Sequence, residues 1–165
     1  MLNSDNNFET EISFSVASEQ ELIASFRPLD QKKLILPVGL KYPLKIRSYF
    51  TWKESSGVYN YLLFKKPTWD LPKGVVFKRA RQPMEFMGTL CSWCHSYTTS
   101  DEIEMLSVAM NSNISAGYIL CRDLRCVEKI EESANLSGKN PEYVIHKLYD
   151  KIGLFFENLS LYKLE

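Results

Sequence analysis

Two short stretches decide the fold: Cys91-Ser-Trp-Cys94 and Cys121-Arg-Asp-Leu-Arg-Cys126, which together hold all four cysteines of this 165-residue chain. Within each stretch, one short loop can present both thiols to the same ion. The stretches are separated by 26 residues. Four thiolates satisfy the tetrahedral demand of a structural zinc ion, with each sulfur about 2.3 Å from the metal. We therefore predict one structural Zn²⁺ held by Cys91, Cys94, Cys121 and Cys126.

Two other interpretations of the cysteines are a redox Cys-x-x-Cys pair and a set of inert buried thiols. The N-terminus is polar and acidic, unlike a secretory signal, and a reducing cytosol favours metal ligands over disulfides. A redox motif would open a helix after a buried strand and would leave the second pair unexplained. His95 follows the first pair, but four sulfurs already complete the shell, so we interpret it as a neighbour.

The segments around the cysteines have the order of a treble-clef zinc site. The first pair lies in a turn, and residues 103–110 and 117–121 read as two strands joined by a turn of Asn and Ser. A helix should begin near Asp123, so Cys126 would lie in its first turn, where the helix dipole favours a thiolate. A knuckle, a hairpin and a returning helix are thus predicted around the ion.

Alternating and helical patterns extend this fold in both directions. Residues 44–52 alternate with a period of two, and with residues 59–66 and 74–81 they predict an antiparallel meander. Ser18 and Glu21 have the spacing of a capping box and predict a short helix that ends before Pro28. Asn140 and Pro141 should begin a long final helix with an apolar stripe from Ile145 to Leu159.

These elements predict the α+β class: a twisted antiparallel sheet with a treble-clef zinc finger and packed helices. The length suits one domain, which we place at residues 18–165. Residues 1–17 are rich in Asn, Ser and acidic side chains, and we predict that they form a flexible acidic arm.

The charges are unevenly distributed, although the net charge is zero. Residues 1–21 carry five acidic and no basic side chains, residues 22–90 carry 13 basic and four acidic ones, and residues 91–165 carry seven basic and 11 acidic ones. The middle block suggests a basic surface for an anionic partner, or else solvated strand faces. No run of about 18 apolar residues is present, so we expect a cytoplasmic protein without membrane contact.

The sequence shows no catalytic set. A closed shell of four thiolates leaves no metal-bound water to activate, and neither a Gly-x-Ser-x-Gly motif nor a phosphate-binding glycine loop occurs. We therefore expect that the protein is not an enzyme.

The run from Cys91 to His95, the strand at 103–110 and the segment from Gly117 to Cys126 resemble the C-terminal treble-clef zinc-finger domain of elongation factor G-binding proteins. That family includes the FusB-type fusidic acid resistance proteins. The resemblance extends over about 145 residues, and Cys-x-Asp-x-x-Cys after Gly-Tyr-Ile-Leu is its most specific part. It implies a cytoplasmic module that binds elongation factor G, and it carries the four cysteines over as zinc ligands.

For the contact surface, we predict a basic rim beside the first knuckle with aromatic anchors, formed by Lys78, Arg79, Arg81, Trp93 and Tyr97. The partner would be elongation factor G, met on the ribosome with rRNA contact, and the protein would be a monomer. The alternative is an RNA-binding or other nucleic-acid-binding zinc protein that uses the basic segment 65–81.

Overall fold

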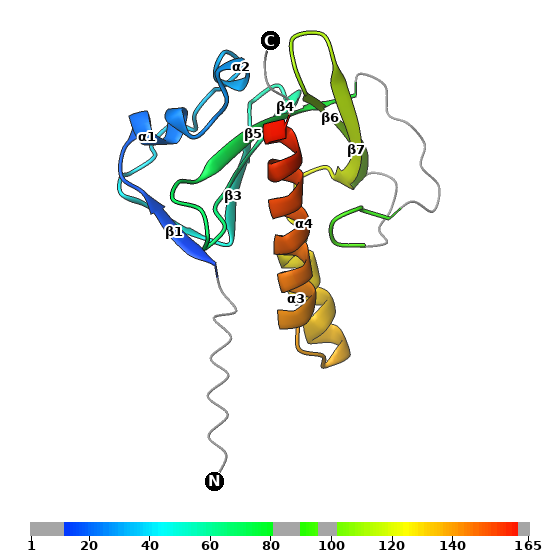
Figure 1. Ribbon diagram of the computed structural model, residues 1–165. Helices are drawn as coiled ribbons and strands as arrows, with labels where there is room; N and C mark the ends of the chain where they lie inside the picture. Colours follow the sequence, from blue (N-terminus) through cyan, green and yellow to red (C-terminus); the bar gives the residue numbers. More distant parts are fainter. Residues whose placement is uncertain (1–11, 81–89, 96–101, 162–165) are drawn as a thin grey trace.

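The fold, as given by a computed structural model, combines two antiparallel sheets with four helices among residues 12–80, 90–95 and 102–161, which are the residues that the structure describes (Figure 1). This confirms the predicted α+β class. The strands are β1 (Ser13–Val16), β2 (Leu44–Arg47), β3 (Tyr49–Lys53), β4 (Tyr59–Phe64), β5 (Lys73–Arg79), β6 (Ile103–Ala109) and β7 (Ser115–Cys121). The helices are α1 (Glu19–Ala24), α2 (Pro28–Gln31), α3 (Cys126–Ser137) and α4 (Glu142–Leu161).

The main sheet has five strands in the order β3-β4-β5-β6-β7, and every neighbouring pair is antiparallel. Strands β3 to β5 form the predicted meander. Strands β6 and β7 form the predicted hairpin, paired from Ile103 and Cys121 to Ala109 and Ser115. Among the residues that the structure describes, the hairpin joins the meander through two residue pairs, Lys78 with Ser107 and Arg79 with Leu106.

The predicted single strand at 44–52 is wrong in one respect, because it is divided at Ser48. That residue has φ 67°, a left-handed conformation that bends the chain between β2 and β3. Strand β2 then pairs with β1, whereas β3 joins the main sheet. The Ser48 hydroxyl lies 2.6 Å from the Tyr149 hydroxyl of α4, which fixes this corner inside the protein.

The predicted arm at 1–17 is also wrong at its C-terminal end. Residues 13–16 form β1, which pairs with β2 from Ser13 opposite Arg47 to Val16 opposite Leu44. Val16 is fully buried. The alternation of Ser with Phe and Val covers only four residues, and these residues belong to a segment whose composition is rich in Asn, Ser and acidic side chains. The short strand was therefore not predicted. Residues 1–11 lie outside the described part of the chain.

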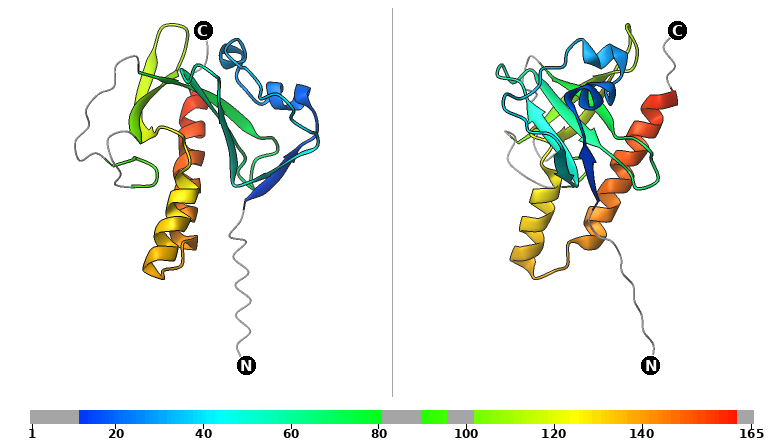
Figure 2. Two further views of the ribbon diagram at one scale, coloured as in Figure 1. Left: turned by 180° about the vertical axis from the view of Figure 1, so that it is seen from behind. Right: turned by 90° about the vertical axis from the view of Figure 1, so that its left-hand side faces the viewer.

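The main sheet is packed on both faces (Figure 2). On one face, α4 packs its apolar stripe across β4 and β5, with Phe155 stacked on Phe77 at 5.5 Å. On the other face, α1, the β1–β2 pair and the 34–42 segment cover Tyr61, Leu63 and Val76. Strand β4 is therefore buried from Asn60 to Phe64 without alternation, and it is the centre of the fold.

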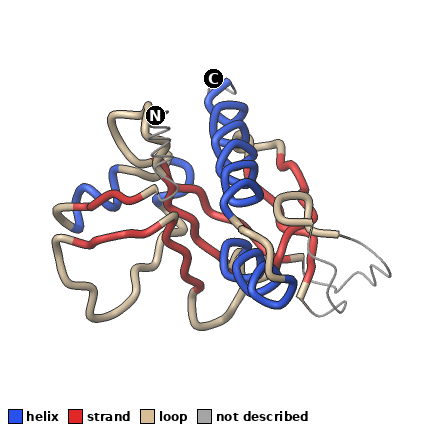
Figure 3. The backbone as a smooth tube through the Cα atoms, turned by 90° about the horizontal axis from the view of Figure 1, so that it is seen from below, coloured by secondary structure: helices blue, strands red, loops and turns tan. Residues whose placement is uncertain are grey.

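Local sequence signals set the ends of the helices. The Glu21 N–H donates to Ser18 Oγ at 3.2 Å, as the capping box predicts, and the Glu142 N–H donates to Asn140 Oδ1 at 3.0 Å. Helix α3 begins at Cys126, slightly later than predicted, and ends before Gly138 at φ 69°. Seen from below, α3 and α4 lie side by side beneath the sheet (Figure 3). Among the described helices, none has the length and apolar character needed to cross a bilayer.

The close contact of Gly74 with Ser25 and Phe26 allows a test of how the segment that follows α1 packs on the sheet. The Gly74 N–H donates to the Ser25 carbonyl at 2.9 Å, and a Cβ at this position would lie 2.6 Å from the Phe26 ring. Phe26 is almost completely buried, so the ring cannot move away. We expect Gly74→Ala to lower the free energy of unfolding by about 2 kcal/mol, measured by chemical denaturation.

The matched control for this substitution is Gly117→Ala. There the added Cβ meets the Met105 sulfur at 3.0 Å, at the end of a flexible side chain. Its loss of stability should be smaller, and equal losses for the two variants would contradict the packing argument.

Candidate metal centre

The four cysteines meet at one point in the interior, and their sulfur atoms all lie within 4.8 Å of one another. The Cys91 and Cys126 sulfurs are 3.8 Å apart, and those of Cys94 and Cys121 are 3.5 Å apart. Four sulfurs at about 2.3 Å from a tetrahedral zinc ion would be separated by about 3.8 Å, so the cluster fits the metal. All four are free thiols and buried, which confirms the prediction of one structural zinc site.

Each pair of ligands is presented by a loop that folds back on its first cysteine. The His95 N–H donates to the Cys91 carbonyl at 2.8 Å, and the Leu124 N–H donates to the Cys121 carbonyl at 3.0 Å. His95 and Leu124 both have positive φ, 55° and 58° respectively. Each loop thus contains one residue in the left-handed conformation, which lies just after the second ligand in the first loop and between the ligands in the second.

Backbone hydrogen bonds attach both loops to the β6–β7 hairpin. The Ser92 N–H donates to the Ile119 carbonyl at 2.9 Å, and the Arg122 N–H donates to the Glu102 carbonyl at 2.8 Å. Cys121 is the last residue of β7, and Cys126 is the first residue of α3. The knuckle, hairpin and helix therefore converge on the cluster in the predicted treble-clef arrangement.

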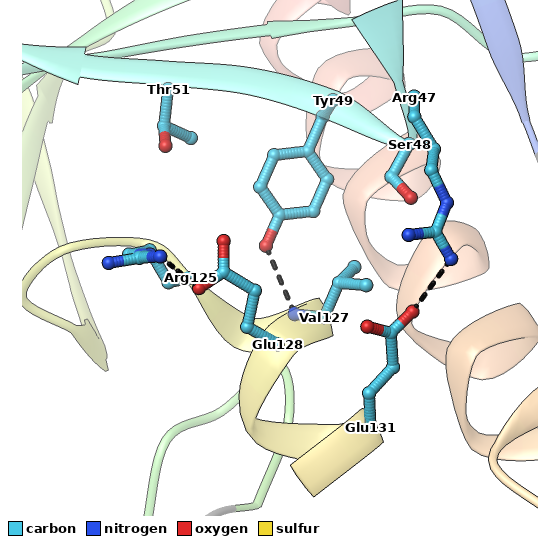
Figure 4. A pocket seen from close by; sticks show the side chains of 8 residues that line it. All are labelled: Arg47, Ser48, Tyr49, Thr51, Arg125, Val127, Glu128 and Glu131. Carbon is cyan, nitrogen blue, oxygen red and sulfur yellow. Dashed lines mark hydrogen bonds and ion pairs between the residues drawn. The ribbon is translucent and has the colours of Figure 1, made fainter.

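Two side chains from the meander, the partly buried Tyr49 and the buried Asn60, hold the second loop, which consists of residues 121–126. Tyr49 Oη donates to the Leu124 carbonyl at 2.6 Å and accepts from the Val127 N–H at 3.3 Å (Figure 4). Asn60 Nδ2 donates to the Arg122 carbonyl at 2.6 Å. Neither residue was predicted as part of the site. Asn60 left a signal, because an amide within a run of apolar strand residues requires a partner.

Helix α4 holds the first loop, which consists of residues 91–95, through one lysine. Lys151 Nζ donates to the Ser92 carbonyl at 3.4 Å and to the Trp93 carbonyl at 3.3 Å, and lies 2.5 Å from His95 Nε2. His95 is exposed and points to this ammonium group, which is consistent with its interpretation as a neighbour of the metal site.

Deprotonation of several neighbouring thiols is unfavourable, because the resulting thiolates repel one another unless a cation compensates their charge. Hydrogen bonds from Cys121 and Cys126 lower the pKa of Cys91 to about 7. The pKa of Cys126 is raised well above its usual value by hydrogen bonds with Cys121 and the other thiols. A divalent ion must therefore displace the proton of Cys126 to complete a shell of four thiolates. Zinc affinity should fall as the pH falls, because protons compete for the same sulfurs.

Within the described part of the chain, the predicted contact residues do not form one patch. Trp93 is buried and packs edge-on against Phe77 and Phe155, at 6.0 and 5.5 Å between ring centroids, so the prediction of an exposed anchor is wrong. Lys78 and Arg79 are adjacent strand residues and point to opposite faces of β5. Arg81 and Tyr97 lie outside the described residues.

Arg79 instead belongs to a cluster with two arginines of the second loop, Arg122 and Arg125. Neither was among the predicted contact residues. Arg79 makes a bidentate pair with Glu104, with both N···O distances at 2.7 Å, and Arg122 lies 3.6 Å from the same carboxylate. Arg125 is half-exposed and pairs with Glu128. All three arginines line a cavity of about 890 Å³ between β3 and the second loop.

A comparison with protein families agrees with this architecture. A family model described as FBP C-terminal treble-clef zinc-finger matches residues 21–159, a segment that includes all four cysteines. A solved structure of the fusidic acid resistance protein FusC is similar with a TM-score of 0.46 and 18% identity, over 73% of this chain and 57% of that one. This chain thus matches little more than half of the FusC chain. No curated protein matches the sequence.

Loss of a ligand should release the metal and unfold the zinc end. We expect Cys91→Ser and Cys126→Ser to lose zinc and, because metal binding supplies folding free energy, to lose the structure of the hairpin and α3. Elemental analysis and far-ultraviolet circular dichroism measure the two effects. Metal-free wild-type protein that contains a disulfide and remains folded would contradict the assignment.

Removal of the Tyr49 hydroxyl tests the link between the sheet and the second loop. We expect Tyr49→Phe to lower the free energy of unfolding of the zinc-loaded protein by about 1–3 kcal/mol, because the Leu124 carbonyl and the Val127 N–H lose their shared partner. Tyr59→Phe is the control, since that hydroxyl makes no hydrogen bond within the described residues. Equal stability of Tyr49→Phe and the wild type would show that the link is unimportant.

Proposed function

Because the chain belongs to the FBP C-terminal treble-clef zinc-finger family, we propose that it is a zinc-stabilised binding module whose partner is elongation factor G. The match over residues 21–159 is the observation that carries the proposal, since it includes both cysteine loops and most of the sheet. In this proposal the protein acts without catalysis, as a cytoplasmic monomer on the translating ribosome, where it also contacts rRNA.

The zinc site would act by fixing a contact surface in place. Residues 122–125 are anchored by metal ligands on both sides, and their carbonyls are held by Tyr49 and Asn60. A loop anchored in this way loses little conformational freedom when it binds, which favours affinity. It presents the side chains of Arg122 and Arg125, which are 43% and 56% exposed.

We place the contact surface on Arg79, Arg122 and Arg125 in place of the set that the sequence predicted. Arg79 is common to both sets. The surface is basic and partly organised by internal carboxylates, so it suits an acidic partner and should accelerate association at low salt. Arg81 and Tyr97 remain predictions for its periphery.

Nucleic-acid binding through residues 65–81 has less support. Lys66 pairs with Glu157, Arg79 pairs with Glu104, and the Lys73 ammonium lies 4.5 Å from the centroid of the Trp69 ring. These interactions engage three cations of the segment, and Arg79 lies at the opposite end of β5 from Lys73, whereas phosphate binding along the segment requires a continuous basic track.

Calorimetric titration of the zinc-loaded protein with purified elongation factor G tests the proposal. We expect binding by the wild type and at least about ten-fold weaker binding by the Arg122→Ala, Arg125→Ala double variant, which corresponds to about 1.4 kcal/mol. Lys139→Ala is the control, because that exposed side chain lies at the far end of α3.

Absence of wild-type binding at micromolar concentrations would overturn the proposal. A titration with RNA at two salt concentrations distinguishes the proposed binding of elongation factor G from nucleic-acid binding. Tight RNA binding that weakens log-linearly with salt would favour the nucleic-acid function instead.

A further inference from the structure

Strand β3 has a free edge. It is the first strand in the order β3-β4-β5-β6-β7 and pairs only with β4, so the described part of the chain places no strand on its other side. Exposed edges of this kind are usually blocked, or else they accept a strand from another chain. Here the blocking features are few: β3 contains no proline and one lysine, Lys53, at its end.

The hydrogen-bond pattern identifies which backbone groups face this edge. The Glu54 N–H donates to the Tyr59 carbonyl directly across the β3–β4 pair, at 3.2 Å. Hydrogen-bonded pairs alternate along antiparallel strands, so Phe50 and Trp52 also bond to β4. The N–H and C=O groups of Thr51 and Lys53 therefore point to the free edge.

A groove runs along the same edge. Five consecutive residues, from Tyr49 to Lys53, line the 890 Å³ cavity, and these residues alternate between the two faces of the sheet. The cavity also contacts Asn60 of β4 and Arg79 of β5, so it extends from the β3 edge across the sheet beside the second loop. Its opposite wall is the second loop and the start of α3, and Figure 4 shows Tyr49 and Thr51 pointing towards that wall.

The groove carries a surplus of positive charge at its rim. Arg79 and Arg122 share the single carboxylate of Glu104, which leaves one guanidinium charge uncompensated. Lys53 is exposed and has no carboxylate partner within the described residues. Glu102 is the one acidic side chain of the lining that has no described cationic partner, so the surplus remains positive.

We propose that β3 accepts an extended acidic segment of elongation factor G as an additional strand. The main-chain groups of Thr51 and Lys53 would bond to this segment, and Lys53 with Arg122 would pair with its carboxylates. The proposal rests on the proposed function and specifies how the partner is held. Main-chain pairing supplies affinity with little dependence on sequence, whereas the charged rim selects an acidic strand.

The decisive comparison is between Thr51→Pro and Thr51→Val in titrations with purified elongation factor G. Proline removes the N–H that faces the edge but no bond to β4, and valine keeps that N–H. We expect Thr51→Pro to bind at least about ten-fold more weakly and Thr51→Val to bind like the wild type. Lys53→Glu should also weaken binding, in contrast to Lys139→Glu.

Hydrogen exchange of the wild-type protein provides a second measurement that does not depend on whether Thr51→Pro folds. We expect the amides of Thr51 and Lys53 to exchange more slowly when elongation factor G is added. Wild-type binding without this protection would overturn the strand proposal and leave the proposed function intact. The same amides could instead be protected without the factor and lose this protection when residues 1–11 are removed. That result would assign the edge to the chain's own N-terminal segment and would also overturn the strand proposal. Absence of wild-type binding would reject the partner and therefore both proposals.

Discussion

Four thiol groups lie within 4.8 Å of one another in the interior of this protein, and they can all be deprotonated only around a cation. This electrostatic requirement links segments that are distant in the sequence: the first knuckle, the end of β7 and the start of α3. The same segments also contribute to the main apolar core, through residues such as Trp93, Leu120 and Leu124, so the metal site adds to apolar burial at the zinc end.

The zinc site is also connected to both layers that surround it. Tyr49 and Asn60 bind the second loop from the sheet, and Lys151 binds the first loop from α4. Because these partners are main-chain carbonyls, the interactions constrain the path of each loop and leave the side chains of Arg122 and Arg125 exposed. A rigid loop with available side chains is the arrangement that recognition surfaces use, and here it follows directly from the ligand spacing.

Local patterns in the sequence predicted most of the fold. The cysteine spacing predicted the metal, the capping box at Ser18 predicted the start of α1, and the Asn140-Pro141 pair predicted the start of α4. The errors arise where tertiary contacts decide. Ser48 adopts positive φ because its hydroxyl meets Tyr149, 101 residues away, and no local pattern indicates that contact. Trp93 was expected at the surface, as an aromatic residue beside basic ones, but the apolar face of α4 covers it.

Burial of β4 on both faces has a consequence for how the protein unfolds. One face of the strand belongs to the core beneath α4, and the other belongs to the core beneath α1 and the β1–β2 pair. Opening of β4 would expose both cores to water at once, whereas either covering layer could open without moving the strand. The amides of β4 should therefore exchange only through global opening.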